Sequence, residues 1–263
     1  MVGVGKASRL AGRRLVVIDA SVRTARIAHS LGCHTVFVQS PGAPVQDLVD
    51  DYSGYYTVDF AGRPDDGPEG AVGDEFAGFV EAVLRPLAPT AVVSLTARGL
   101  LPAAVANALL GTPGTPVEVL KRMAAGVTTA GNGGREFTAY TFTRDGAHRW
   151  PALLDSQSPP VRAEGVVPEQ CLSPQEYGAA QTALNRFLDA TGLEHGPARI
   201  RLWTGGGEVR VTAADHFPGD DEEAALLLRL TGLDLTRWAL GGPLGLQEAD
   251  CDDRRESVEG NAR

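Results

Sequence analysis

The first half of the chain alternates short apolar runs with helical patterns, and this order of elements constrains the fold more than any other feature. The apolar runs are typical of buried strands, and they lie at 15–18, 35–38 and 91–95. The helical patterns lie at 21–32, 75–87 and 98–111, and a short helix and a short strand are expected within 41–60. Strands that alternate with helices predict a parallel sheet with helices on its faces.

From Glu136 onward the pattern changes. Two alternating runs joined at Asp145-Gly146 predict a β-hairpin, and an amphipathic helix follows and ends at Gly192. A second hairpin is expected over 199–217, followed by a last helical region over 221–242. The first half is therefore predicted to be α/β, and the second half α+β.

Length and composition divide the chain into four expected segments. The 263 residues suit one large or two small domains, at about 150 residues per domain. We expect a flexible leader over 1–12, an α/β domain over 13–122, an α+β domain over 123–245 and a disordered tail over 246–263.

Charge and apolar content exclude several classes of partner. A net charge of −9 argues against a nucleic-acid surface or an anionic membrane as the main partner. No run reaches the ~18 apolar residues of a transmembrane helix, and the three cysteines are too widely spaced for a disulfide framework or a zinc site. We therefore predict a cytoplasmic protein.

The second hairpin, "RIRLWTGGGEVRVTAADHF", carries an unusual charge pattern. If residues 204–207 form the loop, Arg201 lies opposite Arg210, and like charges facing one another across two strands are destabilising. One face of the hairpin is then apolar, with Ile200, Leu202, Val209 and Val211, and the other carries Arg199, Arg201, Arg210 and Thr212. The polar face is either solvated, with Glu208 as a counter-charge, or a site that binds an anion.

Four phrases of the sequence resemble parts of ATP-grasp enzymes. "LVVIDASVRTARIAHSLGCHTVFVQS" resembles the first βαβ unit of the pre-ATP-grasp domain of carboxylate–amine ligases and biotin carboxylase-like enzymes. "AVVSLTARGLLPAAVANALLGTPGTPVEVLKRM" is similar to the segment that leads into their ATP-binding half. "REFTAYTFTRDGAHR" resembles the strand pair after the nucleotide lid, and "FLDATGLEHGPARIRLWTGGGEVRVTAADHFPGDD" resembles the region of the metal ligands. The resemblance covers most of 13–245 and implies a parallel-sheet pre-ATP-grasp-like domain followed by a truncated α+β ATP-grasp-like domain.

The chain departs from this family in two places. Between Met123 and Glu136 the family inserts a subdomain with a nucleotide lid, and here only "AAGVTTAGNGGR" remains. The family's carboxylate metal ligands fall at Arg201 and Arg210, and its asparagine ligand falls at Thr212. Since arginine has donors and no acceptor, it cannot ligate a cation. The resemblance therefore implies a degenerate member with no bound metal and no ATP cofactor.

An anion site is the chemistry that the altered residues suit best. A cluster of Arg199, Arg201 and Arg210 would bind carboxylate, phosphate or sulfate through forked donors. Asp215 and His216, which follow the hairpin, are candidate acid or base residues. The resemblance adds two more: Glu136, which starts a strand where the family uses a neighbouring position around the nucleotide, and Glu164, in "EGVVPEQCLS", which resembles a segment bordering the family's substrate site. Glu136 also fits a plain strand-end charge. Cys171 is expected to be a packing residue.

A second set of candidates follows the strands of the first half. Ser94, Thr96 and Arg98 come after a strand and before a helix, so they either touch a ligand at the carboxyl edge of the sheet or cap the helix. Asp19, Ser21 and Arg23 are further candidates for lining the same crevice. The segment "VIDASVRTA" lacks the glycines of a dinucleotide-binding loop, so no NAD or FAD is expected.

These observations predict an ATP-independent biosynthetic protein of secondary metabolism. It would bind a small anionic metabolite of the amino-acid type, free or tethered to a carrier protein, and promote elimination or cyclisation with loss of phosphate or sulfate. Two alternatives remain, an inactive subunit that scaffolds or regulates a true ligase and a divergent ATP-dependent ligase. Because loss of the lid subdomain would uncover apolar surface, a partner subunit or a second copy is expected over 121–135.

Overall fold

The computed structural model describes residue 10 and residues 12–43, 54–60, 72–155 and 172–246. Glu164, Cys171 and nearly all of the predicted leader and tail lie outside these ranges. The chain divides into two compact units, and the first comprises the residues up to Val117 together with the segment that begins at Thr236. The second extends from Glu118 to Leu235. A segment that composition placed in the α+β half is thus part of the α/β unit.

The first unit is built on a fully parallel sheet, as the alternating pattern predicts. Its strands are β1 (Arg14–Ile18), β2 (His34–Gln39), β3 (Gly54–Thr57) and β4 (Ala91–Val93). Their order across the sheet is β3-β2-β1-β4, with every neighbouring pair parallel. The chain therefore moves outward from β1 to β3 and then returns to the other side of β1 for β4. This change of direction places a topological switch point beside β1.

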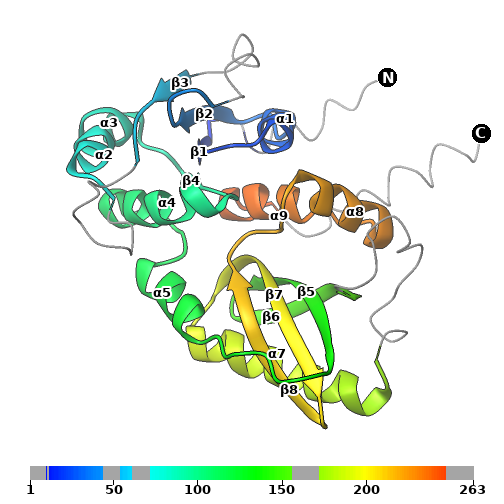
Figure 1. The fold of residues 1–263 in the computed structure, drawn as a ribbon. Coiled ribbons are helices and arrows are strands. Elements are labelled where there is room, and N and C mark those ends of the chain that lie inside the picture. Colours follow the sequence, from blue (N-terminus) through cyan, green and yellow to red (C-terminus); the bar gives the residue numbers. More distant parts are fainter. Residues whose placement is uncertain (1–9, 11, 44–53, 61–71, 156–171, 247–263) are drawn as a thin grey trace, which may run out of the picture. The chain divides into compact units, whose positions relative to one another are not determined.

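Helices cover both faces of this sheet (Figure 1). On one face, Leu15 and Val17 pack with α1 (Val22–Ser30) and α9 (Leu235–Gly241), and a 3-10 turn over Gly242–Leu244 follows α9. The other face packs against a second group of helices. These are α2 (Asp74–Phe79), the π-helical turn η4 (Val80–Leu84), α3 (Arg85–Leu87) and α4 (Ala97–Leu110). No helix in the described part of the chain is long and apolar enough to cross a membrane.

The second unit is an antiparallel sheet with two helices, α5 (Val117–Ala125) and α7 (Pro174–Thr191), packed on its apolar face (Figure 1). Its strands are β5 (Arg135–Arg144), β6 (Ala147–Asp155), β7 (His195–Gly205) and β8 (Glu208–Asp215), in the order β6-β5-β7-β8. Another helix of this unit is α8 (Asp221–Thr231). Side chains of α5 and α7, among them Met123, Leu184 and Leu188, cover the apolar face of the strands.

The β7–β8 hairpin has a different register from the one that the sequence predicts. Gly206 and Gly207 have φ values of 60° and 82°, which suits a two-residue turn rather than a four-residue loop. Arg210 therefore pairs with Trp203, and a bulge between Arg201 and Leu202 places Arg201 opposite Ala213. The predicted opposition of Arg201 and Arg210 is wrong. The predicted apolar face is confirmed, since Ile200, Leu202 and Val211 are buried in the core of this unit and the partly buried Val209 packs against it.

Candidate functional site

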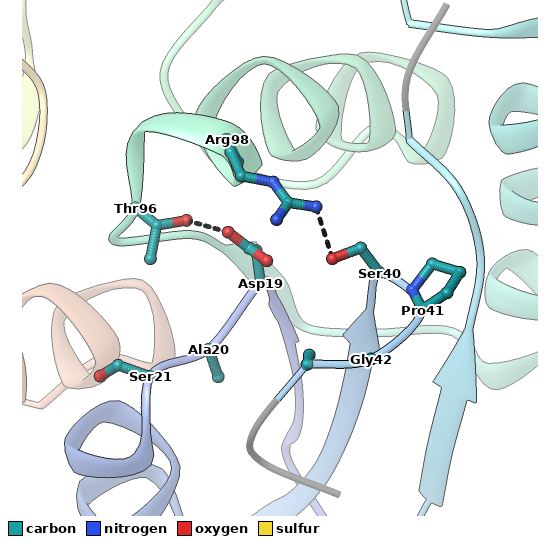
Figure 2. A pocket seen from close by; sticks show the side chains of 9 residues that line it. Asp19, Ala20, Ser21, Ser40, Pro41, Gly42, Thr96 and Arg98 are labelled. Atoms are coloured by element: carbon teal, nitrogen blue, oxygen red, sulfur yellow. Dashed lines mark hydrogen bonds between the residues drawn. The ribbon is translucent and has the colours of Figure 1, made fainter.

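A pocket of about 280 Å³ lies at the carboxyl edge of the parallel sheet (Figure 2). Three segments line it, and each follows the end of a strand. They are Asp19, Ala20 and Ser21 after β1, Ser40, Pro41, Gly42 and Ala43 after β2, and Thr96 and Arg98 after β4. Since β4 and β2 flank β1, the pocket lies at the switch point of the sheet, where open α/β sheets bind their ligands.

The pocket contains Asp19, Ser21, Thr96 and Arg98 from the candidates that the sequence supplies. Arg23 is not among its lining residues, and neither is Ser94, whose buried hydroxyl accepts from the Thr96 backbone N–H at 3.4 Å. Ser40 was not a candidate, although its position directly after β2 is the same signal that identified Asp19 and Thr96.

Asp19 is held in an unusual backbone conformation. Its φ of 54° lies in the left-handed region, which aspartate enters more readily than most non-glycine residues. Its backbone N–H donates to the Val38 carbonyl oxygen at 2.9 Å, so the bend begins directly where the sheet ends. Its Oδ2 accepts a 2.7 Å hydrogen bond from the Thr96 hydroxyl. The carboxylate is therefore fixed at the edge of the pocket by both its backbone and its side chain.

Arg98 supplies the positive charge of the pocket. It is exposed in the first turn of α4, and its guanidinium donates to the Ser40 hydroxyl (Figure 2). Across the described ranges Arg98 makes no ion pair with an acidic side chain. Within this part of the chain its one hydrogen bond is to a neutral hydroxyl, and its other donors make no hydrogen bond there.

The start of α4 is what brings these groups together. Thr96 caps the helix by accepting from the Gly99 N–H at 3.3 Å, and it also lines the pocket. The two roles that the sequence offered as alternatives, helix cap and pocket residue, are therefore both held by Thr96. Gly99 permits the close approach, since a Cβ there would lie 2.2 Å from Ser94 Oγ, 2.9 Å from the Ile18 carbonyl oxygen and 3.0 Å from Asp19 Cβ. Sequence reasoning missed this requirement for glycine.

In the second unit, Arg199 is already neutralised by acidic residues. It donates to Asp215 Oδ2 at 2.9 Å and to Glu223 Oε2 at 2.7 Å, and its guanidinium lies 5.2 Å from the centre of the Phe217 ring. Tyr140 also donates to Glu223, at 2.8 Å, and burial together with that carboxylate raises the pKa of Tyr140 well above its usual value. Asp215, on β8, is thus the ion-pair partner of Arg199 on the neighbouring strand β7.

The other two arginines of the predicted anion cluster occupy different settings. Arg210 donates to Glu208 Oε2 at 3.0 Å and lies 5.4 Å from the centre of the Trp203 ring. Arg201 is exposed opposite Ala213 on β8 and Thr138 on β5, and in the described part of the chain it makes no ion pair. An anion site at this face would therefore depend on Arg201, because Arg199 and Arg210 are already paired with carboxylates.

His216 and Glu136, the other acid or base candidates within the described ranges, are separated along the sheet. His216 is partly exposed as a residue, but its ring packs against Gly196, where a Cβ would lie 2.8 Å from the ring. Burial of the ring lowers the pKa of His216 to about 4, so the imidazole is neutral at pH 7. Glu136 pairs in register with Trp203 on β7.

The glycine-rich segment 131–134, between α5 and β5, packs directly against Trp203. The indole Nε1 donates to the Gly133 carbonyl oxygen at 2.7 Å, and a Cβ on Gly131 or Gly134 would lie 2.5 Å or 2.9 Å from the ring. Of the large apolar side chains within the described ranges, Leu109 is the one that is exposed. The uncovered apolar surface expected near 121–135 is therefore not seen, and a partner over this region stays a prediction.

The parallel-sheet unit and the antiparallel-sheet unit match solved structures of carboxylate–amine ligases and biotin carboxylase, so the chain has an ATP-grasp-like fold, as the resemblance implied. An L-amino acid ligase from Bacillus licheniformis has this fold, with a TM-score of 0.70 and 15% identity over 96% of this chain and 77% of the other. A phosphoribosylglycinamide synthetase from Anaerococcus prevotii follows, with a TM-score of 0.69 and 12% identity over 91% and 77% of the two chains. Glycinamide-RNase-transformylase T from Mycobacterium tuberculosis has a TM-score of 0.64 and 19% identity over 89% and 80%.

These identities are low, so the similarity concerns the fold. No protein-family model and no curated protein matches the sequence. The described residues also contain no group of three or more His, Cys, Asp or Glu side chains placed to hold a metal ion.

Proposed function

We propose that this chain uses the ATP-grasp-like scaffold to bind a small anionic metabolite of the amino-acid type in the first unit, without ATP. The observation that carries this proposal is the Arg98 guanidinium, which enters the pocket without an acidic partner among the described residues. A forked guanidinium matches the oxygens of a carboxylate or phosphate.

The surroundings of Arg98 support an anionic ligand. Ser40 and Thr96 place hydroxyl groups in the pocket, and the residues that cap the N-termini of α1 and α4, Ser21 and Thr96, both line it. The N-terminal ends of helices favour negative charge. The volume of about 280 Å³ is near the lower end of the range of ~300–1,000 Å³ typical of ligand pockets, which suits a small metabolite better than a dinucleotide.

Independence from ATP is supported by the second unit. The segment that would carry a nucleotide lid is a short glycine-rich linker packed on Trp203. The strands that would supply metal-binding carboxylates carry Arg201 and Arg210. One of the structurally similar proteins is an L-amino acid ligase, and this similarity supports an amino-acid-type ligand for the pocket of this chain.

Calorimetric titration of the purified chain tests the proposal. The probes are L-glutamate, L-aspartate and O-phospho-L-serine, each with and without MgATP. We expect binding that MgATP does not change. Arg98→Gln should weaken it by roughly tenfold or more, because a hydrogen-bonded charge pair is lost. Arg26→Gln is the matched control, since Arg26 is an exposed residue of α1 that does not line the pocket.

Two results would contradict the proposal. One is binding that appears only with MgATP or is accompanied by release of ADP, and the other is equal binding by the Arg98 and Arg26 variants. The same samples test the elimination or cyclisation predicted from the sequence, which would release inorganic phosphate from O-phospho-L-serine. Sulfate release from L-serine O-sulfate provides the parallel assay.

A further inference from the structure

We infer that Asp19 makes the pocket selective for ligands that carry an ammonium group beside their anionic group, so that an amino acid binds in preference to the same acid without its amino group. This inference rests on the proposed function, because it concerns the same pocket. In this inference the Asp19 carboxylate binds the ammonium group of the ligand, while Arg98 binds its anionic group.

The pocket holds two opposite charges that do not pair with each other. Figure 2 shows the Asp19 carboxylate turned toward Thr96 and the Arg98 guanidinium turned toward Ser40. Both partners are uncharged hydroxyl groups. Across the described ranges neither Asp19 nor Arg98 forms an ion pair, and both line the same pocket.

The hydrogen bonds also leave suitable atoms available. Among the described residues, the Thr96 hydroxyl donates to Oδ2 of Asp19 and no group donates to Oδ1, so Oδ1 can accept from an ammonium group. Arg98 has five N–H donors and uses one of them for Ser40. A zwitterion satisfies both residues at once. A ligand that carries carboxylates and no amino group would instead bring a negative charge close to the Asp19 carboxylate.

The backbone at position 19 indicates that an acidic side chain is not needed for the turn itself. With a φ of 54°, this position would accept glycine with less strain than aspartate.

An alternative role for Asp19 is to hold Thr96 and the start of α4 in place. That role needs an acceptor oxygen but no charge, so asparagine would fulfil it, and asparagine also tolerates the left-handed conformation.

Asp19→Asn therefore separates the two roles. The full-length chain and this variant are titrated at pH 7 with L-glutamate and with glutarate, which has the same carbon chain and both carboxylates but no amino group. Glu75→Gln is the control, since it removes one negative charge from an exposed position of α2 that does not line the pocket. Circular dichroism and the melting temperature establish that each variant is folded.

We expect the unaltered chain to bind L-glutamate roughly tenfold or more tightly than glutarate. Asp19→Asn should abolish this preference by weakening L-glutamate while leaving glutarate unchanged or tighter. The inference is overturned if the unaltered chain binds both probes equally, or if Asp19→Asn weakens both to the same extent. Failure of the unaltered chain to bind either probe would instead overturn the proposed function, and the inference with it.

Discussion

Arg199 donates through Nη1 to Glu223 Oε2 at 2.7 Å, and this contact joins β7 to the first turn of α8. The same carboxylate accepts from the Tyr140 hydroxyl at 2.8 Å and from the Asp220 backbone N–H at 3.0 Å. Glu223 is therefore the N3 residue of the α8 capping box and also the hydrogen-bond partner of two side chains of the sheet, Arg199 and Tyr140.

Glu223→Ala should lower the free energy of unfolding by about 2 kcal/mol, because it leaves a partly buried arginine with one carboxylate partner fewer and breaks the capping box. Urea denaturation followed by circular dichroism measures the change. Glu222→Ala is the control, since Glu222 is an exposed neighbour in the same turn. A loss no larger than that of the control would show that the network does not stabilise the unit.

The pH dependence of stability should contain a contribution from His216. Burial lowers its pKa from an ordinary value near 6.5 to about 4 in the folded protein, so the unfolded chain binds the proton more readily. The contribution is fully present above pH 6.5 and is lost as the pH falls toward 4, to a total of up to about 3 kcal/mol. Comparing His216→Gln with the unaltered chain between pH 4 and 7.5 isolates it from the carboxylates. Parallel stability curves for the two proteins would refute this assignment.

Gly99→Ala should impair the pocket and the stability of the first unit together. The added methyl group would lie 2.9 Å from the Ile18 carbonyl oxygen, so α4 has to move away from the end of β1. We expect a loss of about 1–3 kcal/mol and weaker binding of L-glutamate. Gly78→Ala in α2 is the control, because a Cβ there meets nothing and should stabilise the helix slightly. Retention of full binding by Gly99→Ala would mean that the approach of α4 does not shape the pocket.

The packing of the glycine-rich segment on Trp203 can be tested with two adjacent glycines. Gly133 and Gly134 both have a positive φ, of 66° and 100°, but only at Gly134 would a Cβ collide, at 2.3 Å from the Thr204 carbonyl oxygen. Gly133→Ala should cost about 1–2 kcal/mol from backbone strain alone, and Gly134→Ala about 1–3 kcal/mol more. Denaturant midpoints with Trp fluorescence measure both. Equal losses would argue against a close contact between this segment and the strand.

The parallel sheet and most of the pocket could be predicted because the signals are local. Apolar runs fix the strands, and the residues that directly follow parallel strands share one edge of the sheet, which is why Asp19, Thr96 and Arg98 were found together. The hairpin register could not be predicted, since "TGGG" permits turns of two to four residues and the choice depends on the φ values of Gly206 and Gly207. The pairing of Arg199 with Glu223 was also missed, because it joins a strand to a helix that lies 24 residues further along the chain.

The first unit is interrupted in the sequence by the whole of the second, and this has a consequence for how the chain is made. Leu240 and Leu244 belong to the same core cluster as Leu15, Val17 and Ala25, yet the ribosome adds them more than 200 residues after β1. Until these residues are made, the face of the sheet that packs against α1 lacks part of its apolar cover. By residue 235, in contrast, all the described strands of the second unit and its helices α5, α7 and α8 have been synthesised. We expect the second unit to reach its native state first during synthesis and the first unit to be completed last. Arrested nascent chains that end before residue 235 and after residue 246, probed by limited proteolysis, would reveal that order.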